Sequence, residues 1–174
     1  MQRRRGRRPV TLDRAAIRRS GRNGLQRRRE GARHSPSLKR VSGFERERVA
    51  GLLSGDPYAK GLGIELVEVT DTEIVVAMDI GVAHTNFLGV GHGGMVFSLA
   101  DCAFSLASNN AGDAAVAIDT HLVLTAATRP GNRLTARVRE VSRGRTLGTY
   151  RAEVARDDGR TVALFTGTVY INRS

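Results

Sequence analysis

The chain has 174 residues, of which 40% are hydrophobic, with a formal net charge of +11, one cysteine and no tryptophan. This length is typical of a single domain with a full hydrophobic core. The lone cysteine, Cys102, excludes an intramolecular disulfide and any cysteine-based zinc site within one chain. No apolar run reaches the roughly 18 residues that a transmembrane helix needs.

The positive charge lies in the first 40 residues, which carry 15 of the 28 basic residues and only two acidic ones. Residues 41–174 therefore hold 13 basic and 15 acidic residues, so we expect no nucleic-acid binding by the folded part. Residues 1–40 are predicted to be a disordered Arg-rich tail, because they combine like-charge repulsion with few aliphatic side chains. Alternatives are an arm for nucleic acid or an anionic surface, a mitochondrial presequence, and upstream sequence read in frame if Val41 is the true start.

The folded domain, residues 41–174, is expected to begin with a short helix. Ser42, followed three residues later by Glu45, matches a capping box ahead of apolar positions. Gly55-Asp56-Pro57 is expected to end this helix. Beyond it, apolar residues recurring with a period of two predict strands. The six predicted strands lie at residues 62–70, 73–80, 114–127, 132–142, 146–156 and 161–171.

Two of these strands show the alternation clearly. In the fourth, Leu134 and Val138 fall on the face opposite Arg137, which predicts a sheet with one buried and one solvent-exposed face. In the second, Val75 falls on the face opposite Ile74.

One long helix is predicted between the second and third strands, from Gly93 to Asn109. Apolar side chains cover most of its circumference, which is typical of a helix buried by a sheet. The order of the elements therefore predicts an α+β domain, in which a six-stranded antiparallel sheet wraps around one central helix.

The predicted helix has one narrow polar stripe, in which Asp101 lies three residues after Ser98 and four before Ser105. A carboxylate in apolar surroundings loses solvation, which raises its pKa unless hydrogen-bond donors hold the charged form. Asp101 is therefore a candidate functional residue; the alternative is a partly exposed aspartate in a cap or an ion pair. Cys102, beside it, is predicted to be a core thiol rather than a nucleophile.

A glycine-rich stretch from His84 to Gly94 leads into the helix. Free backbone N–H groups and the positive end of the helix dipole at such an N-terminus can hold an oxyanion; the alternative is a turn with a helix cap. His84 and His92 are eight residues apart with no third ligand nearby, so we expect no metal site. The Gly-x-Ser-x-Gly motif of serine hydrolases is absent.

The run from Asn86 to Asp101, N-x-x-G-x-x-H-G-G and then F-S-L-A-D, resembles the phenylacetate-degradation (PaaI-like) thioesterase family of the hotdog superfamily. The similarity extends over residues 44–172. It implies an acyl-CoA thioesterase that hydrolyses its substrate to free acid and coenzyme A, as a homodimer or a dimer of dimers. The expected location is the cytoplasm, because a single cysteine fits a reducing compartment. Coenzyme A is then part of the substrate, and no cofactor is expected.

The resemblance also implies roles for individual residues. Asp101 corresponds to the carboxylate that acts as general base or nucleophile, and Gly93 to the glycine whose N–H polarises the thioester carbonyl. Asn86 and His92 correspond to residues that place the thioester. Because the active site of the family lies between subunits, Asp101 of one chain would face the Gly93 loop of its partner. Further substrate-binding candidates are Gly94 and Ser105.

The phosphates of coenzyme A suit arginine side chains at the rim of the sheet. Arg143 and Arg145, in the predicted turn between two strands, are the candidates, and a solvated turn is the alternative. The chemistry also agrees with the resemblance. A thiolate leaves readily, so one carboxylate and one oxyanion donor suffice for thioester hydrolysis.

Two other functions compete with hydrolysis. The first is a hotdog module that senses acyl-CoA and binds nucleic acid through its basic arm, but residues 1–40 lack helix-turn-helix spacing and a binder does not need Asp101. The second is an enoyl-CoA hydratase, whose paired Asp and His are not evident. The sequence leaves open the acyl group (aryl-acetyl, benzoyl-type or medium aliphatic), whether Asp101 attacks the carbonyl or activates water, and whether two or four chains assemble.

Overall fold

The computed structural model describes residues 43–173, so the predictions for the tail and for a start at Val41 lie outside the described residues. The elements are α1 (Arg46–Ser54), α2 (Pro57–Gly61), β1 (Glu65–Val69), β2 (Ile74–Asp79), the 3-10 helix η1 (Val82–His84), α3 (Gly93–Asn109), β3 (Ala114–Leu124), β4 (Arg133–Arg143), β5 (Leu147–Arg156) and β6 (Thr161–Asn172). The six strands form one antiparallel sheet in the order β1-β2-β4-β5-β6-β3.

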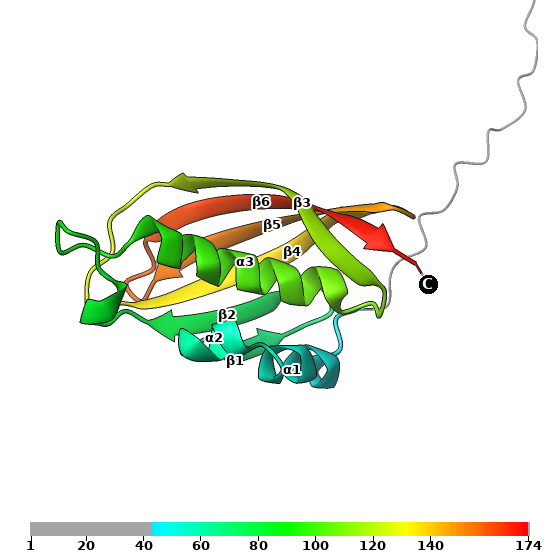
Figure 1. Cartoon of the computed structure of the whole chain (residues 1–174), viewed down its shortest axis with the longest axis horizontal. Helices are drawn as coiled ribbons and strands as arrows, with labels where there is room; N and C mark the ends of the chain where they lie inside the picture. The colour runs from blue at the N-terminus through cyan, green and yellow to red at the C-terminus, as the bar shows by residue number, and fades with distance from the viewer. Residues whose placement is uncertain (1–42, 174) are drawn as a thin grey trace, which may run out of the picture. The chain divides into compact units, whose positions relative to one another are not determined.

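The central helix α3 lies along one face of this sheet, and α1 and α2 lie beside it near β1 and β2 (Figure 1). The bounds of α3 are those predicted from its apolar circumference. The α+β hotdog architecture expected from the sequence is therefore confirmed. Within residues 43–173, no helix is both long and apolar enough to cross a membrane.

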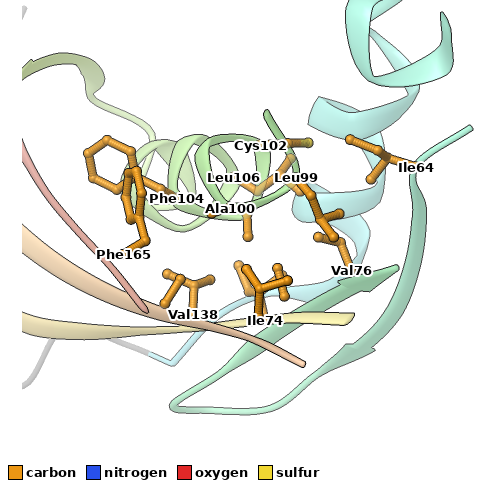
Figure 2. Close-up of a cluster of buried hydrophobic side chains, with 14 of the residues drawn as sticks. Ile64, Ile74, Val76, Leu99, Ala100, Cys102, Phe104, Leu106, Val138 and Phe165 are labelled. Atoms are coloured by element: carbon orange, nitrogen blue, oxygen red, sulfur yellow. The ribbon is translucent and has the colours of Figure 1, made fainter. Parts of the chain in front are cut away.

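The hydrophobic core forms between α3 and the sheet. Figure 2 shows Leu99 and Phe104 of α3 within a cluster that includes Ile74, Val138 and Phe165 from the strands. All five side chains are almost completely buried, and each contributes roughly 1.5–3 kcal/mol when it leaves water. The ring of Phe104 lies 5.4 Å from that of Phe165 between centroids, so aromatic contacts hold the helix against β6.

The outer face of the sheet differs between strands. On β4, Leu134 and Val138 are buried while Arg137 is exposed, which confirms the predicted solvent-exposed face. On β2 the prediction was incomplete, because Val75 is buried as well as Ile74. Val75 pairs with Arg137, whose side chain forms ion pairs with two glutamates from this edge of the sheet, so its aliphatic part covers the neighbouring strand.

The N-terminal helices correct the sequence analysis at two points. The predicted capping box is wrong, since α1 begins at Arg46 with Glu45 as its N-cap and without a side-chain cap. The backbone N–H of Glu45 instead donates to Asn110 Oδ1 at 3.3 Å, which holds Glu45 in an extended conformation at the end of α3.

The second point is helix α2, which the sequence analysis did not predict. Gly55-Asp56-Pro57 ends α1 as expected, since α1 stops at Ser54 with Gly55 as its C-cap, and a second helix begins directly after it. Asp56 caps this helix by accepting hydrogen bonds from the N–H groups of Tyr58 (2.9 Å) and Ala59 (3.0 Å). Pro57 occupies the first helical position, where its missing N–H costs nothing. The Asp-Pro pair was therefore the start signal of a helix. Ala59 is fully buried, so this short helix is anchored in the core.

Candidate active site

The Asp101 carboxylate lies on the polar stripe of α3 and is half-buried. Loss of solvation raises the pKa of Asp101 above its ordinary value, and among residues 43–173 no hydrogen-bond donor or cation offsets this effect. Ser98, next to it on the stripe, is half-buried, and Gly94 and Ser105 are exposed. The stripe therefore presents a carboxylate of increased basicity with unoccupied oxygens, as a general base or nucleophile requires.

At the start of α3, the backbone N–H of Gly93 has no partner within residues 43–173. His92 is the N-cap, and its Nδ1 accepts a hydrogen bond from the N–H of Gly94 at 2.9 Å. The proton of the neutral His92 ring is then on Nε2. Gly93 is the first helical residue, and no acceptor for its N–H is found within the described part of the chain. The His92 ring thus accepts the N–H of Gly94, and the N–H of Gly93 is the donor that is available to an oxyanion.

The loop before α3 is held by its own backbone. Asn86 Oδ1 accepts from the Leu88 N–H at 2.9 Å, and the backbone of Asn86 exchanges hydrogen bonds with Val90 and Gly89. The Nδ2 group of Asn86 has no partner among residues 43–173 and can donate to a ligand. Gly91 donates to the carbonyl oxygen of Thr128 at 2.8 Å, which fixes the far end of the loop.

A cavity of about 400 Å³ lies between this loop and the end of β3. Its walls combine polar and apolar surface in similar amounts, and Asn86 and Gly93 are among its lining residues. The others are Val90, Gly91, Val96, Leu124, Thr125, Ala126, Ala127 and Thr128. The structure thus brings together Asn86 and Gly93 at one cavity. Asp101 does not line it, because it follows Gly93 by eight residues on the same helix and lies about 12 Å away along the axis.

The structure corrects the expectation for Arg143. Its side chain is 4% exposed, and its Nη1 donates to the carbonyl oxygen of Ser108 at 2.9 Å and to the hydroxyl of Tyr150 at 2.7 Å. Arg143 therefore supplies a hydrogen-bond donor to a carbonyl group at the C-terminal end of α3, and it is not accessible to a phosphate. A register shift between Glu140 and Ser142 turns it to the inner face of the sheet. Arg145, in the turn between β4 and β5, is exposed.

Two further residues, one beside the stripe and one at the cavity, were not recognised from the sequence as site residues. The Tyr58 hydroxyl on α2 lies 2.8 Å from Ser98 Oγ, and the only signal was an aromatic residue directly after the Asp-Pro pair. Thr128, at 2% exposure, closes the loop below Gly91. Cys102 is buried and its pKa is raised to about 12 by loss of solvation, which confirms a core thiol. No group of three or more metal-ligating side chains occurs within residues 43–173.

Comparison with known proteins connects this geometry to a family. Residues 88–163 match the model of the Thioesterase superfamily. The acyl-coenzyme A thioesterase PaaI of Escherichia coli K12 is 35% identical over 116 residues, which make up 67% of this chain and 83% of that protein. The solved structure of E. coli PaaI, from the phenylacetic acid degradation operon, is similar with a TM-score of 0.71 and 32% identity, covering 74% of this chain and 93% of that one.

A structure with coenzyme A extends the comparison. It is a hypothetical thioesterase from Streptococcus pneumoniae, with a TM-score of 0.60 and 26% identity, covering 64% of this chain and 88% of that one. The fold, the helix N-terminal donor and the matches agree. The chain belongs to the PaaI-like, hotdog-fold family of the thioesterase superfamily, and it is a thioester hydrolase.

Proposed function

We propose that the protein hydrolyses acyl-coenzyme A thioesters with aryl-acetyl or medium-chain acyl groups, in an active site formed by two copies of the chain. The observation that carries the proposal is the N–H of Gly93, which lies at a small cavity and has no acceptor within residues 43–173, combined with the desolvated carboxylate of Asp101 on the same helix. The E. coli relative is an acyl-coenzyme A thioesterase, and the S. pneumoniae structure holds coenzyme A, which supports this substrate class.

The proposed chemistry needs two groups on the reacting carbonyl. The Gly93 N–H and the Asn86 amide polarise the thioester oxygen and hold the negative charge that develops on it. Asp101 takes a proton from water as the water oxygen bonds to the carbonyl carbon, or attacks that carbon directly before water releases the acid. The carbon–sulfur bond breaks and coenzyme A leaves as a thiolate. In this assignment Arg145 binds the phosphates, and His92 places the thioester together with Gly94 and Ser105.

Two copies are needed because Gly93 and Asp101 of one chain are about 12 Å apart and cannot contact the same carbonyl. Strand β3 offers a surface for assembly, since it pairs with β6 on one side and its other edge is free within residues 43–173. Its side chains Val116, Ile118 and Leu124 are exposed, although a free apolar edge is unfavourable in an isolated domain. In the proposed twofold dimer, each chain contributes Asp101 to one site and Gly93 to the other.

The primary test is thiol release from a panel of acyl-CoA substrates by the wild type and by Asp101→Asn. We expect release by the wild type and a loss of about 10²–10⁴-fold in the variant. Tight binding of acyl-CoA without release by the wild type would contradict hydrolysis and favour the sensing module. The free thiol of Cys102 and a coenzyme A substrate both suit a reducing cytoplasm, where we place the reaction.

The shared site is tested by mixing two inactive variants, Asp101→Asn and Gly93→Pro. Proline removes the N–H of the first helical position, which tolerates it, and Gly93→Ala is the matched control that keeps the N–H. After denaturation and joint refolding, half of the dimers combine one chain of each kind and have one intact site. We expect about a quarter of the wild-type rate. No recovery, with mixed dimers confirmed by mass spectrometry, would place both groups in one chain.

A further inference from the structure

Tyr58 on α2 is an exposed aromatic residue held in a defined position beside the Asp101 stripe. Its side chain is 63% exposed, yet its hydroxyl lies 2.8 Å from Ser98 Oγ. Helix α2 is fixed on either side of it, by the Asp56 cap and by the fully buried Ala59. A tyrosine side chain has only two rotatable bonds, and here its hydroxyl is already hydrogen-bonded. It therefore loses little more conformational entropy when a ligand packs against it.

The direction of the Tyr58 hydrogen bond follows from the contacts of Ser98. The hydroxyl of Ser98 has one hydrogen, which it donates to the carbonyl oxygen of Gly94 at 2.9 Å. The Tyr58 O–H must therefore donate to Ser98 Oγ. The lone pairs of the Tyr58 oxygen and the exposed part of its ring remain free for a ligand.

This hydrogen bond places the ring close to Asp101. Ser98 and Asp101 are three residues apart on α3, so their side chains are neighbours with about 5–6 Å between Cβ atoms. The other side chains of the stripe, Ser98 and Ser105, are small and polar, and they offer little apolar surface to an acyl group. Aromatic surface on this side of Asp101 comes from α2.

We propose that Tyr58 is a specificity-determining residue, which selects aromatic over aliphatic acyl groups by packing against them beside Asp101. This proposal rests on the proposed hydrolysis of acyl-CoA and names its substrate class. Two aromatic rings in an offset or edge-to-face arrangement gain stabilisation beyond that of their buried area, which corresponds to about threefold to tenfold in selectivity.

The experiment compares kcat/KM for phenylacetyl-CoA and hexanoyl-CoA in the wild type, Tyr58→Phe and Tyr58→Leu. Tyr58→Phe keeps the ring and loses the hydroxyl, whereas Tyr58→Leu loses both and keeps apolar volume. We expect the ratio of phenylacetyl to hexanoyl kcat/KM to fall about threefold to tenfold in Tyr58→Leu and to stay within twofold in Tyr58→Phe. Tyr170→Leu, the same change on the outer face of β6, is the control and should leave the ratio unchanged.

A parallel fall of both substrates in Tyr58→Leu, with a lower unfolding temperature, would overturn the proposal, since Tyr58 would then only hold α2 on α3. An unchanged ratio at full activity would overturn it as well. The binding of two thioethers, S-phenethyl-CoA and S-hexyl-CoA, is measured in the same variants by calorimetry. These probes are not hydrolysed, so the selectivity of Tyr58 is tested even if the wild type releases no thiol, which would refute the hydrolysis and not the packing.

Discussion

Replacing Asp101 by asparagine should change stability and activity in opposite directions. The substitution keeps the shape of the side chain and removes its charge. Because burial raises the pKa of Asp101, the folded state holds the ionised carboxylate less well than the unfolded chain does. A group whose pKa is raised on folding stabilises the protein fully below its unfolded pKa, and this contribution is lost as the pH rises through the folded pKa. At pH 7 the ionised Asp101 therefore lowers the free energy of unfolding, and replacement by asparagine removes this loss.

The size of this cost is limited by solvent. Asp101 is half-buried, and screening at such a site keeps the gain in unfolding free energy from Asp101→Asn at or below about 1 kcal/mol. In a domain of this size, that gain corresponds to a rise of about 2–6 °C in the unfolding temperature. The rate of thiol release should fall by about 10²–10⁴-fold in the same variant, because the group that takes the proton is gone.

Thermal unfolding of both proteins at pH 7 and at about pH 3.5 tests this reasoning, since Asp101 is largely protonated at the lower pH and the difference between the proteins should shrink there. Asp157→Asn, in the exposed turn between β5 and β6, is the control and should change neither property. If Asp101→Asn is less stable than the wild type at pH 7, the carboxylate makes favourable contacts in the folded protein. Its desolvation would then not be what prepares it for catalysis.

Three further perturbations address the rest of the structure. Gly93→Pro should lower kcat by about 10²–10³-fold in thiol-release assays, while Gly93→Ala, which keeps the N–H, should stay within about tenfold; equal losses would mean that the N–H is not the donor. Burial raises the pKa of Tyr150 to about 12, so the wild type should lose stability between its unfolded pKa of about 10 and pH 12, and Tyr150→Phe should flatten this loss in urea unfolding. Gly167→Ala places a Cβ 2.8 Å from the Phe104 ring and should cost about 1–3 kcal/mol in the same measurement, whereas no loss would indicate a looser core.

Hydrophobic periodicity was sufficient to predict the helix and the strands. The apolar circumference of α3 is interrupted by few polar residues, so its bounds at Gly93 and Asn109 followed from composition and the flanking glycines. The strands differ from their predicted ranges mainly at their ends, where pairing with the neighbouring strand rather than the apolar pattern decides the limits. The first predicted strand, 62–70, is an example, since β1 begins at Glu65.

Features that depend on contacts between distant residues were not predicted. The N–H of Glu45 bonds to Asn110, 65 residues away, and this contact rather than the local capping motif determines where α1 begins. The direction of the Arg143 side chain could not be predicted from the sequence pattern either. Strict alternation places it on the outer face with Arg137, but the irregularity after Glu140 reverses the alternation and buries it. A one-residue bulge cannot be recognised from the alternation of apolar and polar residues in the sequence.

The candidate site has features that the local sequence pattern predicts and features that depend on distances in the folded chain. The residue types that carry the proposed chemistry were evident, because a carboxylate within an apolar helix and a glycine pair at its start are unusual in sequence. Their distance is set by the helix, and the separation of about 12 Å between Gly93 and Asp101 is the reason why the proposed active site takes one group from each of two chains. Under this proposal, assembly is part of the chemistry. The exposed apolar side chains of β3 would then be retained as the surface that completes the site.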